Sequence, residues 1–425
     1  MATTAAPTIN RWAVLWGSVA ILMCTGAIYA FSVFAGPLAA EHGWTMPAVM
    51  LAFGINGAIS PIPMILGGYI VDRGGARYSI LAGGLLFAAG FILAGLATTT
   101  TQLYLTYGIV AGIGQGLAYS GCLSNTLKFF PDRRGQAAGL ITGGMGMAAV
   151  VAAPVASWLI REHGIGTAFV AMGSVYAVVV VIGSLFVRVA PVGYAPAGWT
   201  PPTGAGPAVA VPFTGMLRTS TFYFILVLLA LGAFSGLMIA ANASGIGQGM
   251  FGLTAATAAL FVSAYAASNM LGRVVWGAVS DRIGYLNALK LIYAVVAASM
   301  LVLVTVSSVA GFAVGIVGLG LCFGGVMGVF PALVMKSFGP RFQGINYGIV
   351  FSAYAVTAYF APSFAARIGA AHDGDFTTAF VIAIGLALAG LVVAFVFTAV
   401  QRAQVAAQAA QAADGQAPVV AGTRA

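Results

Sequence analysis

Twelve apolar segments, each long enough to cross a lipid bilayer, follow one another along this chain, separated by charges, Gly/Pro clusters and short polar turns. A backbone in lipid must satisfy its hydrogen bonds internally, so these segments predict helices. Charged residues make up only 6% of the chain, against roughly 25% in soluble domains. We therefore predict an all-α membrane protein with twelve transmembrane helices. The predicted spans lie near 12–39, 47–71, 78–97, 102–128, 136–160, 167–188, 219–248, 254–280, 287–306, 308–336, 343–367 and 376–400.

The basic residues predict the orientation of these spans. Of the 17 Lys and Arg residues, all except Arg161, Arg273 and Arg367 fall in segments that would share one surface. Because basic residues accumulate on the cytoplasmic side, we expect both termini to be cytoplasmic in a multi-pass cell (inner) membrane protein. The net charge of +9 does not indicate nucleic-acid binding, since the basic residues form no patch interleaved with aromatic residues.

An internal repeat divides the chain into two related halves. The segment GYIVDRGG (68–75) recurs as GAVSDRIG (277–284), a shift of 209 positions. The same shift carries Phe129, Pro131 and Gly135 onto Phe338, Pro340 and Gly344. One constant offset at two separated loops predicts two pseudo-symmetric six-helix bundles.

The predicted domain boundaries follow the composition. Residues 1–188 form the first bundle and 219–402 the second. The segment 189–218, rich in Pro, Gly and Ala, is typical of a linker and is predicted to be cytoplasmic. The Ala- and Gln-rich residues 403–425 are predicted to be a cytoplasmic tail that is disordered, with a weak helix as the alternative.

The loop GYIVDRGGAR resembles the signature of the major facilitator superfamily, Gly-x-x-x-Asp-Arg/Lys-x-Gly-x-Arg/Lys. The resemblance implies the major facilitator fold and a conformational gate. Physically, Gly68 permits close helix approach, and Asp72 can pair with cations or helix ends. A plain charged turn is the alternative. The predicted gating residues of the two repeats are Gly68, Asp72, Arg73, Gly277, Asp281 and Arg282.

Three segments carry a narrower resemblance, to monocarboxylate transporters and the oxalate/formate antiporter family. They are FFPDRRGQAAGLITGG (129–144), SNMLGRVVWGAVSDRIG (268–284) and NYGIVFSAY (346–354). In that family an Arg lies four residues before the Gly of the second signature, a spacing that Arg273 and Gly277 reproduce. The resemblance implies transport of small carboxylates.

Arg273 is the only formal charge predicted within the membrane interior. A charge at that depth costs at least about 2.5–3.5 kcal/mol, so we expect it to face a wet cavity with a partner. All eight acidic residues fall in predicted loops, which leaves no internal carboxylate. A permanently charged planar donor can bind an incoming carboxylate by two hydrogen bonds. The alternative is an Arg that caps backbone carbonyls or snorkels to the surface.

The spacing of Tyr265, Asn269 and Arg273 predicts one polar stripe on a helix, with Asn269 orienting the guanidinium. Animal monocarboxylate transporters are similar but have an Asp at the matching position, so any proton coupling here would use the substrate carboxyl, water or a tyrosine. In the similar oxalate transporters the position of Tyr354 is a Lys. Its absence favours a substrate with one carboxylate, such as lactate or pyruvate.

Other predicted contacts follow from the resemblance. Tyrosine hydroxyls would bind the carboxylate or a 2-hydroxyl, and apolar side chains would contact a short alkyl chain. For each residue taken singly, core packing is the alternative. The predicted substrate-binding residues are Arg273, Tyr119, Tyr29, Asn269, Phe351, Tyr354, Phe323, Met145 and Ile28.

Nothing in the sequence indicates an enzyme, because it contains no phosphate-binding loop and no Gly-x-Ser-x-Gly elbow. Cys24, Cys122 and Cys322 lack metal-ligand spacing, so no metal or cofactor is predicted. The expected partners are a monocarboxylate anion, protons and the lipid bilayer, and the expected functional unit is a monomer. The leading hypothesis is proton-coupled symport of a lactate-like substrate by alternating access. The alternatives are oxalate/formate-type exchange, a drug or sugar facilitator, and a nutrient sensor.

Overall fold

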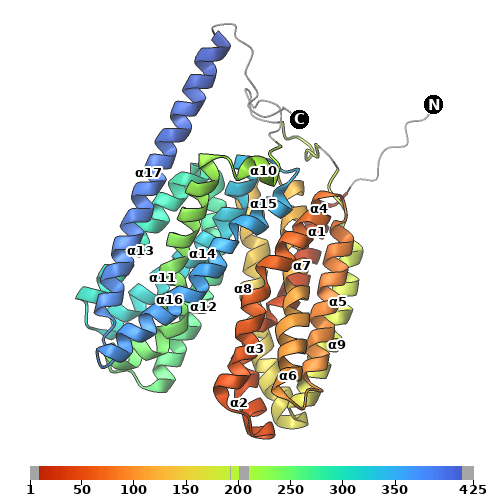
Figure 1. Ribbon diagram of the computed structural model, residues 1–425, viewed down its shortest axis with the longest axis vertical. Coiled ribbons are helices and arrows are strands. Elements are labelled where there is room, and N and C mark those ends of the chain that lie inside the picture. Colours follow the sequence, from red (N-terminus) through yellow and green to blue (C-terminus); the bar gives the residue numbers. More distant parts are fainter. Residues whose placement is uncertain (1–8, 192, 201–209, 414–425) are drawn as a thin grey trace, which may run out of the picture.

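The computed structural model describes residues 9–191, 193–200 and 210–413, and the regular structure of these residues is helical. Figure 1 shows two helix bundles side by side, one from each half of the chain. The first contains α1 (Arg11–Thr25), η1 (Gly26–Ala30), α2 (Phe31–His42), α3 (Met46–Ile59), α4 (Pro61–Asp72), α5 (Ala76–Ala94), α6 (Thr100–Leu103), η2 (Tyr104–Val110), α7 (Ala111–Phe129), α8 (Arg134–His163) and α9 (Ile165–Phe186). The second contains α10 (Phe213–Met216), α11 (Ser220–Phe251), α12 (Ala255–Ile283), α13 (Tyr285–Thr305), α14 (Val309–Phe338), α15 (Gln343–Val350), α16 (Ser352–Ala371) and α17 (Thr377–Ala413).

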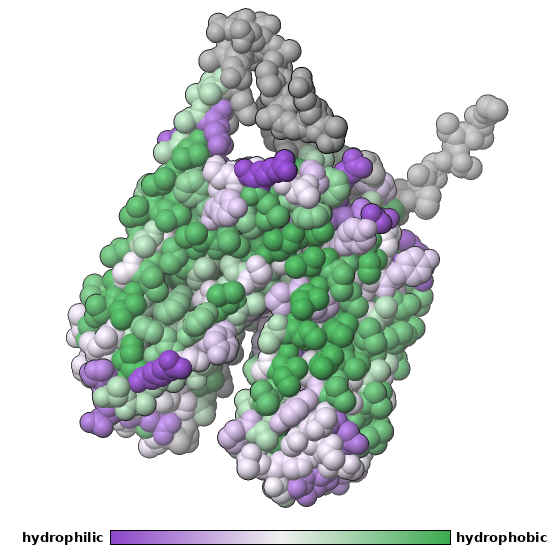
Figure 2. Space-filling model, viewed as in Figure 1, coloured by the Kyte–Doolittle hydropathy of each residue, from purple (hydrophilic) through white to green (hydrophobic). Residues whose placement is uncertain are grey.

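Eleven segments of the described chain are long and apolar enough to cross a membrane, and they coincide with eleven of the predicted spans. The twelfth, predicted at 102–128, forms α6, η2 and α7. Buried polar residues such as Gln115 and Asn125 make α7 less apolar than the other spans, and the π-helix η2 interrupts the segment. In Figure 2 apolar residues cover the sides of both bundles and hydrophilic residues gather at the two ends. This distribution fits a multi-pass membrane protein.

Two spans contain breaks that position candidate site residues. The first span bends through the short 3-10 segment η1, where a Cβ on Gly26 would lie 2.5 Å from the carbonyl oxygen of Met145. Only glycine allows α8 to approach this closely. The eleventh span is divided into α15 and α16 at Phe351. Tyr29 and Phe351 therefore lie at irregular points of their helices, where side-chain directions change.

The bundles meet at the end that carries the termini and separate toward the other end. The helices that join them are α8 with α12 and α14, and α4 with α15. Figure 2 shows a groove between the bundles that opens at the end opposite the termini. The structure is therefore closed at one end and open at the other.

The segments outside the bundles differ in part from the prediction. The linker 189–218 contains the short helix α10 and pairs with the second bundle, where the Val211 amide donates to the Phe338 carbonyl at 3.0 Å. Residues 192 and 201–209 of the linker lie outside the described residues. Helix α17 continues to Ala413, so disorder is wrong for residues 403–413 and the helical alternative holds there. Ala and Gln have high helix propensity, which explains the continuation. The rest of the predicted tail, 414–425, lies outside the described residues.

Candidate functional site

Two aspartates join the bundles at the end that carries the termini. Asp72, the last residue of α4, accepts hydrogen bonds from the amides of Gly344 and the next residue at 3.1 and 3.0 Å. Asp281, on α12, accepts from the amides of Gly135 and the next residue, both at 2.8 Å. First-turn amides lack intrahelical partners and lie at the positive end of the helix dipole. Each carboxylate therefore caps a helix of the other bundle.

The two contacts are related by the 209-residue repeat. Asp72 and Gly344 correspond to Asp281 and Gly135 with the bundles exchanged. Glycine pairs support both contacts, since a Cβ on Gly68 would lie 2.2 Å from the Gly344 carbonyl carbon, and one on Gly277 would lie 2.3 Å from the Gly135 oxygen. The backbones touch directly, so a larger residue would force them apart.

The two aspartates differ in their third partner. Lys128 Nζ forms an ion pair with Asp72 Oδ1 at 3.2 Å, whereas the Tyr285 hydroxyl donates to Asp281 Oδ1 at 3.2 Å. We call Asp72, Gly68, Gly344 and Lys128 the Asp72 junction, and Asp281, Gly277, Gly135 and Tyr285 the Asp281 junction. The other predicted gating residues, Arg73 and Arg282, are exposed, and Arg73 lies 4.1 Å from the Tyr69 ring centroid.

Helices α8 and α12 diverge from the Asp281 junction toward Arg273. A Cβ on Gly139 would lie 2.2 Å from the Arg273 carbonyl oxygen, as tight a contact as at the junction. One turn further, a Cβ on Gly143 would lie 3.3 Å from Val274 Cγ2, and a Cβ on Gly146 would be 3.7 Å from Arg273 Nε. The Arg273 side chain therefore occupies the point where the helices begin to separate.

The Arg273 side chain is only 7% exposed and reaches across the boundary between the bundles. Its Nε donates to Asn269 Oδ1 at 3.0 Å, and Nη1 donates to the Thr142 carbonyl on α8 at 2.7 Å. The hydrogen bond by which Asn269 was predicted to orient the guanidinium is thus present. The bond to the Thr142 carbonyl is a contact of the kind expected if Arg273 caps backbone carbonyls, which was the alternative. The four ion pairs among the described residues involve other cations, so the partners of Arg273 there are neutral.

Four tyrosines lie within electrostatic range of the Arg273 guanidinium, namely Tyr119, Tyr265, Tyr347 and Tyr354. Tyr29, which is 44% exposed, lies within the same range of Tyr119 and Tyr354. One cation and several hydroxyl groups from both bundles are thus gathered in one place, where they can bind an anion.

Aromatic rings form a continuous row from the first bundle to the second. Tyr119 on α7 lies 6.1 Å from Phe351 between ring centroids, and Phe351 stacks on Tyr354 at 4.6 Å. Tyr354 is stacked with Phe323 at 6.4 Å, and Phe323 with Tyr265 at 6.5 Å. The predicted residues Tyr119, Phe351, Tyr354 and Phe323 therefore belong to one aromatic row, which is also part of the packed core.

The remaining predicted residues lie in different surroundings. Met145, like Tyr119, belongs to the apolar core that extends into both bundles. Ile28 is buried in a separate cluster of the first bundle, apart from Arg273 and the aromatic row. The Tyr265 hydroxyl donates to the Gly236 carbonyl at 2.6 Å, so it is directed toward α11.

Sequence reasoning missed several contributors. Thr142 acts through a backbone carbonyl, which no side-chain pattern reveals. Tyr347 lies four residues before Phe351, and their ring centroids are 5.8 Å apart, but it was not assigned to the site. The repeat did carry one unused signal, because it pairs Gly135 with Gly344, the two residues that the aspartates cap.

Comparison with known proteins is consistent with this architecture. A family model described as Major Facilitator Superfamily matches residues 15–362 and 251–424. The chain belongs to the major facilitator superfamily. As a member it is a multi-pass membrane transporter and not an enzyme, and the predicted family and fold are confirmed.

The chain has distant relatives with named activities. It is 29% identical over 383 residues to the oxalate:formate antiporter of Oxalobacter formigenes, with 88% of each chain covered. It is 25% identical over 394 residues to monocarboxylate transporter 13 of Bos taurus, again with 88% of each chain covered. At this distance the family is shared, whereas substrate and coupling remain to be derived from the site.

Solved structures share the superfamily fold. The proton:xylose symporter XylE, bound to 6-bromo-6-deoxy-D-glucose, superposes with a TM-score of 0.69 at 15% identity, over 91% of this chain and 95% of that one. The transporter FucP in the outward conformation gives 0.67 at 16% identity, over 91% and 98%. These similarities establish the fold alone.

Proposed function

We propose that this major facilitator carries small monocarboxylate anions, such as lactate or pyruvate, by proton-coupled symport with alternating access. The observation that carries the proposal is Arg273, a buried cation held across the boundary between the bundles by neutral partners only. A buried charge without a countercharge is costly, and an entering carboxylate relieves that cost.

The chemistry of the guanidinium favours a carboxylate. It has five N–H donors in a planar fork, and its two hydrogen bonds to described residues leave donors for two parallel bonds to one carboxylate. Tyr119 and Tyr354 add neutral hydroxyl groups without adding charge. One cation balances one negative charge, which supports a monocarboxylate over a dicarboxylate.

The position of Arg273 also connects binding to movement. Its bond to the Thr142 carbonyl joins α12 to α8, the helices that must separate if the bundles rock. A carboxylate that takes over this donor replaces a contact between the bundles by a contact to substrate. In the proposed cycle the Asp72 and Asp281 junctions hold the end with the termini closed while the opposite end is open.

Exchange of carboxylates is the second candidate. It is favoured by the 29% identity to a protein named oxalate:formate antiporter. The two modes give different results in liposomes: symport responds to an inward proton gradient, whereas exchange requires carboxylate on the opposite side. Both candidates need Arg273, so the site and the coupling are tested separately.

The site is tested by uptake of labelled L-lactate into liposomes that contain the purified protein. We expect Arg273→Ala to reduce uptake by two orders of magnitude or more, since removing one partner of a buried charge pair costs roughly 3–5 kcal/mol. Arg273→Lys should retain part of the activity, because it keeps the charge but loses the planar fork. Arg367→Gln is the control, since it removes an exposed cation from the second bundle.

The results of these experiments test the anion site and the mode of coupling separately. If Arg273→Ala transports like the wild type, or if no mono- or dicarboxylate raises the thermal stability of the wild type, the anion site is wrong. If lactate uptake is unchanged by an inward proton gradient but requires internal carboxylate, symport is wrong and exchange replaces it.

A further inference from the structure

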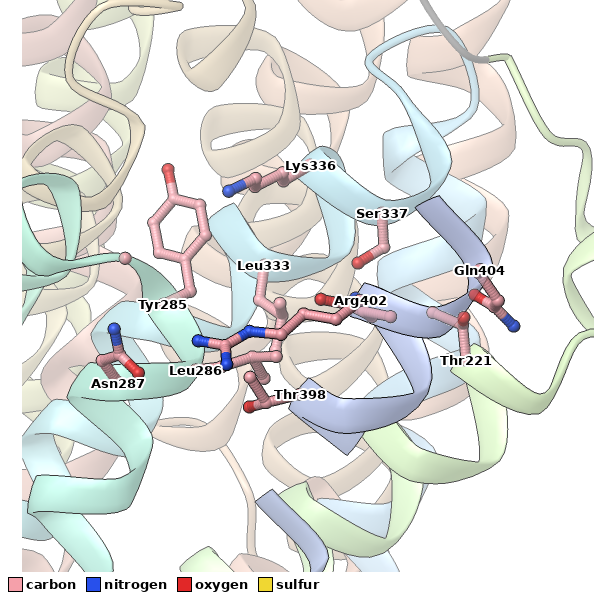
Figure 3. Close-up of a pocket in the computed structure, with 12 residues that line it drawn as sticks. Thr221, Tyr285, Leu286, Asn287, Leu333, Lys336, Ser337, Thr398, Arg402 and Gln404 are labelled. Atoms are coloured by element: carbon pink, nitrogen blue, oxygen red, sulfur yellow. The ribbon is translucent and has the colours of Figure 1, made fainter. Parts of the chain in front are cut away.

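A polar cavity of about 410 Å³ lies in the second bundle at the end that carries the termini (Figure 3). It is separate from the Arg273 site and plays no part in the proposed transport cycle. Its walls come from the first turns of α11 and α13, the end of α14 and the distal part of α17. Lys336 and Arg402 extend over it from α14 and α17.

The charge in this cavity is of one sign. Lys336 and Arg402 line it, and no acidic residue does so in the part of the chain that the structure describes. Lys336 and Arg402 repel each other, so an anion placed between them is stabilised.

The cavity wall also supplies backbone donors. Gly284 to Asn287 border the cavity and include the first turn of α13. No side chain among the described residues caps this helix start. Because first-turn amides and the helix dipole favour negative charge, this end of α13 acts in the same direction as the cations. Thr398, Gln401 and Ser337 add neutral hydrogen-bonding groups.

An exposed apolar face begins next to the cavity. Leu291 and Val295 on α13, with Val392 and Phe395 on α17, are all more than one-third exposed. These helices pack against each other, and the Lys290 ammonium lies 4.5 Å from the Phe395 ring centroid. In a membrane-spanning protein this face contacts acyl chains. A ligand that combines a phosphate with acyl chains can therefore use the cavity and this face together.

We infer that the cavity binds the phosphate group of an anionic phospholipid, with the headgroup between Lys336 and Arg402 and the acyl chains along α13 and α17. Basic pockets beside membrane helices commonly bind anionic headgroups. The shared chemistry is a phosphate, which free inorganic phosphate also offers. The apolar face favours the lipid as its source.

The inference is tested by native mass spectrometry of the purified, delipidated full chain titrated with phosphatidylglycerol. The double variant Lys336→Gln/Arg402→Gln should bind phosphatidylglycerol about 25-fold more weakly, since each basic residue near the surface contributes about fivefold. Arg188→Gln/Arg341→Gln removes the same charge from exposed positions outside the cavity, and should weaken binding less than twofold. Phosphatidylcholine, which has no net charge, should bind weakly to all three proteins.

Three outcomes would overturn the inference. The first is equal loss of affinity in the two double variants, which would mean that surface charge alone attracts the lipid. The second is equal affinity of the wild type for phosphatidylcholine. The third is a thermal shift with inorganic phosphate that is lost in Lys336→Gln/Arg402→Gln, while binding of phosphatidylglycerol is the same in that variant and the wild type. That result would assign the cavity to free phosphate. If the double variant is unstable, Arg402→Gln alone should still weaken lipid binding about fivefold.

Discussion

The Asp72 and Asp281 junctions use the same geometry with different chemistry. Each places a carboxylate on two first-turn amides of the other bundle, beside a pair of touching glycines. At Asp72 the additional partner is the cation Lys128, and at Asp281 it is the neutral Tyr285. The repeat therefore retained the carboxylate and the touching glycines and changed only the third partner of the carboxylate.

The helices that are capped also differ. Asp281 caps α8, a continuous helix of 30 residues that also contacts Arg273 through Thr142. Asp72 caps α15, which has only 8 residues before the break at Phe351. A displacement at the Asp281 junction is thus transmitted along a rigid helix to the candidate site, whereas one at Asp72 can be absorbed at the break. The two junctions should contribute unequally to closure.

Glycine substitutions are expected to give the largest difference in closure between the Asp72 and Asp281 junctions. Gly135→Ala would place a Cβ 2.2 Å from the Gly277 oxygen, and Gly344→Ala would place one 2.5 Å from the Gly68 Cα. Overpacking of this kind costs about 1–3 kcal/mol, which would shift the population away from the closed end by roughly 5- to 150-fold. We expect Gly135→Ala to have the larger effect, because α8 has no break that could absorb the displacement.

The measurement is the distance distribution between spin labels at Tyr78→Cys and Ile283→Cys, two exposed positions in different bundles. The native cysteines are buried, so they compete little for the label. Gly143→Ala on α8 is the matched control, since its nearest contact would be 3.3 Å from a side-chain carbon. Closure that is unchanged in Gly135→Ala, or reduced equally in Gly143→Ala, would contradict the role of backbone contact.

Asp72→Asn and Asp281→Asn are expected to differ less in how much of the closed population they lose. Both variants lose a charged cap, which is worth about 0.5–2 kcal/mol. Asp72→Asn also leaves the partly buried Lys128 without its countercharge, whereas the Tyr285 hydroxyl can still donate to an amide oxygen. We therefore expect a greater loss of the closed population in Asp72→Asn, measured with the same label pair. Equal losses would mean that helix capping alone explains both junctions.

Much of the fold follows from sequence because membrane helices are determined by local apolarity and by charged ends. The span that departed most from the others is α7, whose polar residues are buried inside the protein and not exposed to lipid. The helical continuation to Ala413 could only be given as an alternative, because low hydrophobicity favours disorder whereas Ala and Gln favour helix.

The candidate site was predictable only where side chains carry the chemistry. The charge of Arg273 and its spacing to Asn269 are visible in the sequence, and their hydrogen bond follows from helix geometry. The Thr142 carbonyl is not visible, because every residue has one and only tertiary packing selects it. The side-chain direction of Ile28 is likewise not visible, since an apolar residue next to Tyr29 can face either the groove or the core.

The smallest difference between the two junctions is expected in how their closure responds to salt concentration. The Lys128–Asp72 pair is mostly buried, with side-chain exposures of 17% and 5%, so salt should weaken it only slightly, although the Debye length falls from roughly 10 Å at 0.1 M to 3 Å at 1 M. The Tyr285 hydrogen bond has a neutral donor and should change little. Raising NaCl from 0.05 to 1 M should therefore reduce the closed population of Tyr285→Phe, which retains the ion pair. Lys128→Gln, which removes the ion pair at the Asp72 junction, should respond less. Identical salt responses in the two variants would show that the ion pair does not distinguish the junctions.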